Sequence, residues 1–168
     1  MPLRILLGAV SGAAATFVLQ ALMKQTAKSF PDSKPPIKED PGAFMVDKAE
    51  SLLPEAARAR ISEKAEAVAA KSLHLGYGMS AGAVYGALRG KGGWLLVDGT
   101  LLGLAVWGIG YLGWLPATDL MPPVTEHSSQ QVIAPLVQHT VFGLATVSAY
   151  RGMMRVGRRD KQVDLNPS

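Results

Sequence analysis

The sequence predicts an all-α membrane protein in which four transmembrane helices form two tandem hairpins. Its mean hydropathy of +0.18 and its 48% hydrophobic content are high for a soluble chain of 168 residues. The apolar residues gather in four long segments, and so short a chain has too little polar surface to cover all four in water. We therefore expect lipid around most of the chain, with spans at about residues 5–23, 72–88, 97–116 and 128–150.

The first predicted span has the length and flanking charges of a transmembrane helix. Ile5 to Met23 are 19 residues without a charge, with Arg4 before them and Lys24 after them. Arg4 and the small residues at 13–15 also fit a signal peptide. We expect the segment to be retained as a helix, because crossing the hydrocarbon layer takes about 20 apolar residues.

An insertion at residues 27–71 separates the first two spans and is predicted to lie outside the membrane. Four prolines in residues 27–41 predict an extended linker. Residues 47–71 are rich in Ala, Glu, Lys and Arg, and predict an amphipathic helix. This helix could lie at the membrane surface, run directly into the second span, or be an ordinary solvated connection. Its less polar side is predicted to carry Ile61, Ala65, Val68 and Ser72.

Glycines separated by four residues give several predicted spans a bare ridge. In water such helices would be poor, since each interior glycine costs about 1 kcal/mol relative to alanine. In a bilayer the ridge lets a neighbouring backbone come close, which is how helices associate there. We therefore expect helix packing at Gly8, Gly12, Gly78, Gly82, Gly86, Gly99, Gly103 and Gly143.

Aromatic residues near the ends of the spans are predicted to anchor the helices at the membrane interface. Trp94 and Trp114 are 20 residues apart, which corresponds to about 30 Å along a helix, the thickness of the hydrocarbon layer. Tyr85 and Tyr150, close to the ends of the second and fourth spans, are predicted to have the same role.

Lysine and arginine in the short connections predict that both chain ends lie on the cytoplasmic side. Arg89 and Lys91 lie between the second and third spans, whereas the connection between the third and fourth has neither residue type. The net charge of +4 has its surplus in a C-terminal tail, which we expect to contact anionic lipids and not nucleic acid. The basic residues of this tail are Arg151, Arg155, Arg158, Arg159 and Lys161.

An internal repeat relates the second and fourth spans. Each has a histidine, an aromatic residue three positions later, then a glycine, and a tyrosine seven positions after the glycine. Because both copies lie in even-numbered spans, the pattern predicts two helical hairpins related by an axis along the membrane normal. The paired residues are His74, Tyr77, Gly78 and Tyr85 with His139, Phe142, Gly143 and Tyr150.

Three interpretations of the histidine pair are open at this point. The two rings could be structural, each bonded to a carbonyl or a tyrosine hydroxyl across the bundle. His74 and His139 could instead ligate a haem b iron or a metal ion, or relay protons together with Asp98. Asp98 could also simply reach water, or pair with Arg89 or Lys91.

Catalytic motifs are absent from the sequence, which therefore does not predict an enzyme. The chain has no cysteine, which excludes disulfides, thiolate nucleophiles and sulfur-ligated metals.

Three runs of the sequence resemble a known family. They are LHLGYGMSAGAVYGALRG (residues 73–90), GLAVWGIGYLGWLPATDLMPP (103–123) and QHTVFGLATVSAY (138–150). These runs are similar to the YagU-like family of bacterial inner-membrane proteins, and the resemblance implies a multi-pass inner-membrane protein of unknown function.

The sequence as a whole favours a non-enzymatic accessory or scaffold subunit whose glycine-faced helices pack against membrane partners, within a larger membrane complex. Two alternatives belong to other classes: a bis-His haem b electron carrier, and a small proton-linked transporter or channel that uses His74 and His139.

Overall fold

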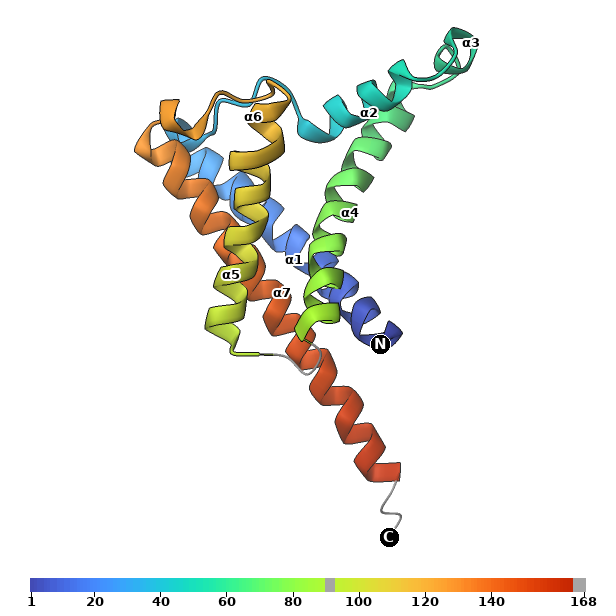
Figure 1. Cartoon of the computed structure of the whole chain (residues 1–168), viewed down its shortest axis with the longest axis vertical. Helices are drawn as coiled ribbons and strands as arrows, with labels where there is room; N and C mark the ends of the chain where they lie inside the picture. Colours follow the sequence, from blue (N-terminus) through green and yellow to red (C-terminus); the bar gives the residue numbers. More distant parts are fainter. Residues whose placement is uncertain (90–92, 165–168) are drawn as a thin grey trace.

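The computed structural model describes residues 1–89 and 93–164, with side chains as far as Val156, and all its regular elements are helices. The N-terminus and the last described residues before 165 lie toward the same end of the bundle (Figure 1). The long helices are α1 (Pro2–Ser29), α4 (Glu63–Arg89), α5 (Leu95–Gly108) and α7 (Ser129–Asp164). The short elements are η1 (Pro31–Ser33), α2 (Pro41–Ser51), α3 (Glu55–Arg58), the π-helical η2 (Ile109–Trp114), α6 (Leu115–Ala117) and η3 (Val124–Glu126).

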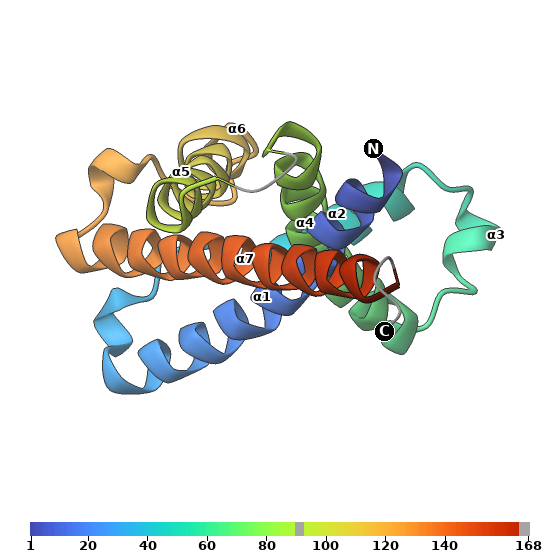
Figure 2. The ribbon, with the colours of Figure 1, turned by 90° about the horizontal axis from the view of Figure 1, so that it is seen from below.

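The helices pack as two antiparallel pairs. Helix α1 packs along α4, and α5 packs along α7. The pairs are joined because α7 also packs along α1, so that α7 lies between α5 and α1 (Figure 2). In contrast, α4 contacts α5 and α7 only locally. The all-helical class is thus confirmed, and the long helices form two hairpins, α1 with α4 and α5 with α7.

The number of spans differs from the prediction. Among the described residues, three helices are long and apolar enough to cross a membrane: Pro2–Ser29, Leu95–Ala117 and Ser129–Val156. Helix α4, which contains the predicted second span 72–88, is not among them. Its first two turns carry Glu63 to Lys71, and Gly, Ser, His and Tyr dilute the apolar residues that follow. Three helices therefore have the length and composition of membrane spans, and a span at α4 remains a proposal.

The insertion is also organised differently from the prediction. The single helix expected over residues 47–71 is divided into α2, α3 and the beginning of α4. Pro54 contributes to this division, because proline disfavours helical conformation in the residue before it. Residues 63–71 run without a break into the second predicted span as the first part of α4, which was one of the expected arrangements. Val68, on the predicted less polar side, is 58% exposed. Helix α4 instead meets α2 through Ala70, which lies against the backbone of Gly42.

Helix α2 is fixed in place at its N-terminal end. Asp40 caps it by accepting a hydrogen bond from the Ala43 N–H at 2.9 Å. The Lys38 N–H donates to the Leu120 carbonyl at 2.9 Å, and Phe44 packs on an apolar cluster at the end of α6. Helix α2 therefore extends from α6 to the N-terminal half of α4 (Figure 1). The buried residues of this cluster are Tyr111, Leu115, Leu120 and Met121.

Candidate functional site

The first hairpin is held by contacts between backbones. A Cβ atom added at Gly8 would collide with the Gly82 carbonyl, and one added at Gly12 would collide with the Gly78 carbonyl. One at Gly86 would meet the carbonyl of Arg4. The three contacts follow one antiparallel register, and only glycine permits so close an approach.

The second hairpin uses the same device. A Cβ atom at Gly103 would collide with the His139 carbonyl, and one at Gly143 with the Gly99 carbonyl. A Cβ atom at Gly99 would lie 2.8 Å from the Cα of Leu144. All the glycines expected to pack therefore lie at helix contacts, and those contacts are inside the chain.

The repeated tyrosines meet each other. The rings of Tyr85 and Tyr150 are 5.4 Å apart at an interplanar angle of 85°, and both side chains are buried. They therefore pack inside the bundle and do not face lipid headgroups as expected, because each fills the space where the two hairpins join. Trp94 is exposed, as an interface anchor would be, while Trp114 is half-buried against the cluster at the end of α6.

A buried carboxylate connects the end of α4 to the beginning of α5. The Asp98 side chain is only 1% exposed, and its Oδ1 accepts hydrogen bonds from Arg89 Nη2 at 2.5 Å and Nε at 3.2 Å. Its Oδ2 accepts from the Tyr85 hydroxyl at 3.0 Å. Of the three partners expected for Asp98, the structure therefore supplies Arg89; Lys91 lies outside the described residues.

His139 is held within its own hairpin. Its Nδ1 lies 2.8 Å from the Pro135 carbonyl, one turn earlier in α7, so Nδ1 carries the donated proton. The ring centroids of His139 and Tyr111 are 5.7 Å apart in a T-shaped arrangement. Tyr111 stacks on Trp107, with ring centroids 5.8 Å apart. The histidine thus bonds within α7 and packs on the π-helical segment of the facing helix.

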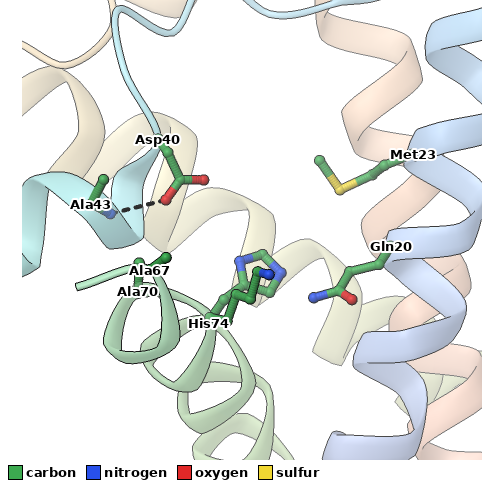
Figure 3. Close-up of a pocket in the computed structure, with 8 residues that line it drawn as sticks. Gln20, Met23, Asp40, Ala43, Ala67, Ala70 and His74 are labelled. Atoms are coloured by element: carbon green, nitrogen blue, oxygen red, sulfur yellow. Dashed lines mark hydrogen bonds between the residues drawn. The ribbon is translucent and has the colours of Figure 1, made fainter. Parts of the chain in front are cut away.

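His74 has different surroundings, in a cleft between α1 and α4. The cleft has a volume of about 480 Å³ and an open side. Figure 3 shows Gln20 and Met23 reaching from α1 toward His74, with Asp40 and Ala43 of the α2 terminus nearby. The lining residues are Gln20, Met23, Asp40, Ala43, Ala67, Ala70, Lys71 and His74.

The arrangement does not favour a haem bound by both histidines. The imidazoles are near enough to interact electrostatically. The cleft that contains His74, however, is not lined by His139, whose ring is packed on Tyr111. No group of three or more metal-ligating side chains occurs in the described part of the chain. A bis-His haem would need the second ring to leave its packing.

A single proton relay through all three groups is not favoured either. His74 and Arg89 are 15 residues apart on the continuous helix α4, which corresponds to about 22 Å. Asp98 is bonded to Arg89 and therefore lies at the opposite end of α4 from His74. The carboxylate belongs to the structural link between α4 and α5.

Sequence reasoning missed the cleft. Gln20 lies inside the first predicted span, and Asp40 and Lys71 lie in the predicted insertion, so the sequence does not bring them together. The antiparallel register set by the glycines could have revealed them, because its continuation beyond Gly12 and Gly78 brings Gln20 opposite Ala70 and Lys71.

The basic tail is only partly described. Arg151 and Arg155 follow Tyr150 on α7, which continues beyond the other helices (Figure 1). The side chains of Arg158, Arg159 and Lys161 lie outside the described residues. No protein-family model, curated protein or solved structure matches the chain.

Proposed function

We propose that this chain is a non-enzymatic integral membrane protein of four spans, which acts as an accessory or scaffold subunit by presenting one face of α4 to a membrane partner. In this proposal it belongs to the YagU-like family and lies in the bacterial inner membrane with both ends in the cytoplasm. The basic tail of α7 contacts anionic lipids there.

The observation that carries the proposal is the unequal use of the glycines of α4. Gly78, Gly82 and Gly86 are occupied by α1, whereas nothing lies within 4 Å of a Cβ built on Gly76. Gly76 lies between Ser72 and Ser80 at intervals of one helical turn, and both serines are exposed. Small residues at this spacing favour close approach of another transmembrane helix.

The serine hydroxyls do not obstruct such an approach. Ser72 Oγ donates to the Val68 carbonyl and Ser80 Oγ to the Gly76 carbonyl, both at 2.8 Å. Their polar groups are thus satisfied within α4, and the face they form is smooth and nearly apolar. The contacts to a partner would use this face, since the other glycines of α4 are already engaged by α1.

Placement in the membrane is tested by fractionation and by cysteine labelling. The chain has no cysteine, so each introduced one reports a single position. We expect the protein to sediment with membranes, and Thr125→Cys and Ser51→Cys to react with an impermeant maleimide added to intact cells. Leu3→Cys should react only after lysis. Labelling of Ser51→Cys and Thr125→Cys from opposite sides would show that α4 does not cross the membrane.

The accessory role is tested by purification in mild detergent with a matched pair of variants. Gly76→Leu adds bulk where space is free, so it should leave the fold unchanged but abolish a stoichiometric membrane partner. Ala14→Leu makes the same kind of addition on an exposed position of α1 and should retain that partner. A wild-type protein that purifies without a partner, from cells at native expression, contradicts the proposal.

A further inference from the structure

The cleft between α1 and α4 begins where the glycine contacts end. Up to Gly12 and Gly78 the two backbones touch. Beyond this point α1 presents Gln20 and Met23, and α4 presents Lys71 and His74. These longer side chains keep the helices apart, and α2 closes one side because Gly42 lies against Ala70, with a built Cβ 2.6 Å from its carbonyl. The cleft is therefore a fixed consequence of the packing.

The polar side chains of the cleft are unengaged. Lys71, His74 and Gln20 make no hydrogen bond or ion pair with any residue that the structure describes. Asp40 uses Oδ1 to cap α2, and its Oδ2 has no hydrogen-bond partner there. The cleft thus combines one unpaired cation and two further donors with one carboxylate, and its remaining lining is Met and Ala.

The depth of the cleft matches the level of lipid headgroups. Lys71 and Arg89 are 18 residues apart on α4, or about 27 Å, close to the thickness of the hydrocarbon layer. With Arg89 at one interface, Lys71 lies at the other, at the headgroup level of the leaflet opposite the chain ends. A volume of about 480 Å³ is also within the range typical of small-molecule sites.

We propose that this cleft binds the headgroup of a phosphatidylethanolamine-type lipid, with the phosphate at Lys71, His74 and Gln20 and the ammonium at Asp40. The charges are complementary, because such a headgroup carries one phosphate anion and one ammonium with three donors. Choline has no N–H to donate to Asp40, and glycerol has no positive charge. The acyl chains leave through the open side, past Met23, into the bilayer. The inference rests on the membrane placement proposed above, but not on the partner role.

Native mass spectrometry of the purified full chain tests this proposal with three lipids of identical acyl chains. We expect phosphatidylethanolamine to bind about tenfold tighter than phosphatidylcholine or phosphatidylglycerol, the effect of one charge-assisted hydrogen bond. Lys71→Gln should weaken binding of all three lipids about tenfold, and Lys71→Arg should preserve it. Asp40→Asn, which can still cap α2, should remove the preference for ethanolamine over choline and glycerol and leave the phosphate contacts unchanged.

Matched controls come from the same helices. Lys64→Gln on α4 and Asp47→Asn on α2 remove the same charges at exposed positions outside the cleft, and should bind like the wild type. Equal affinity for the three headgroups, or equal effects of Lys71→Gln and Lys64→Gln, overturns the proposal. Soluble phosphoethanolamine that binds as tightly as the lipid overturns the assignment to a membrane lipid. A chain that sediments with membranes but shows no headgroup preference disproves this inference alone.

Discussion

The two hairpins, α1 with α4 and α5 with α7, share one packing device but bury their repeated residues to different extents. In both, glycines bring the antiparallel backbones into contact. Yet Phe142 of α7 is 1% exposed, and its repeat counterpart Tyr77 of α4 is 43% exposed. The glycines therefore determine how the two helices of each hairpin pack. They do not determine how much of each helix is buried.

The difference follows from the neighbours of α4 and α7. Helix α7 packs on α1 along its length, so its repeated residues face two helices. Helix α4 has no equivalent contact along α5, because the two helices meet at few residues, the link made by Asp98 among them. Above that link, α2 lies between the N-terminal half of α4 and α6 (Figure 1). The insertion thus breaks the symmetry of the repeat and leaves the cleft.

The strongest test of the glycine contacts is a branched side chain placed at one of the contact glycines of each hairpin. In Gly82→Val the Cβ would approach Gly12 N at 2.9 Å, and in Gly143→Val it would approach Gly103 N at 2.6 Å. Since the neighbouring backbone cannot move aside, each variant should lower the free energy of unfolding by more than about 3 kcal/mol. Circular dichroism in detergent should then show no cooperative unfolding transition. Gly76→Val, with open space around it, should unfold like the wild type; equal damage in all three variants would refute the packing.

The difference in burial predicts unequal costs at equivalent positions. Phe142→Ala removes a buried ring that packs with Ala15, Leu19 and Val106, and should cost about 3–5 kcal/mol. Tyr77→Ala should cost less, about 1 kcal/mol, because 43% of that residue is already exposed. Reversible unfolding in SDS measures both values. Similar costs would mean that α4 is covered as fully as α7.

The link between the hairpins should show coupling between its two buried side chains. Asp98→Ala leaves the Tyr85 hydroxyl without the acceptor 3.0 Å away, at a cost of about 1–3 kcal/mol. Adding Tyr85→Phe removes the stranded hydroxyl, so the double variant should be more stable than the sum of the single effects implies. A double-mutant cycle with purely additive effects would show that the two groups do not interact.

The smallest expected contrast is between the two histidines. His139→Ala loses the bond to Pro135 and the contact with Tyr111, and should lower the free energy of unfolding by about 1–2 kcal/mol. His74→Ala should change it by less than about 0.5 kcal/mol, because this exposed side chain bonds to no described residue. A larger loss at His74 would point to a structural role in place of ligand binding.

Several features could be predicted because they depend on local pattern. The long apolar segments predict the helical class, and glycines at every fourth residue predict where helices come into contact. The burial of Tyr85 and Tyr150 could not be predicted. A tyrosine near a helix end suits the membrane interface and the interior of a bundle equally well. The division of residues 47–71 was also missed, since its helical composition outweighed the signal from Pro54.

The sequence by itself determined which segments are helical and apolar, and which faces of those helices carry no side chains. Spacing along one helix suffices for this, because 3.6 residues per turn fixes the face on which each residue lies. Only the tertiary structure decided that α7 packs on two helices and α4 mainly on one, that Asp98 is bonded to Arg89, and that Lys71, His74 and Asp40 share a cleft. These features depend on contacts between segments that are far apart in the sequence. Which of those contacts form depends on how the whole chain packs.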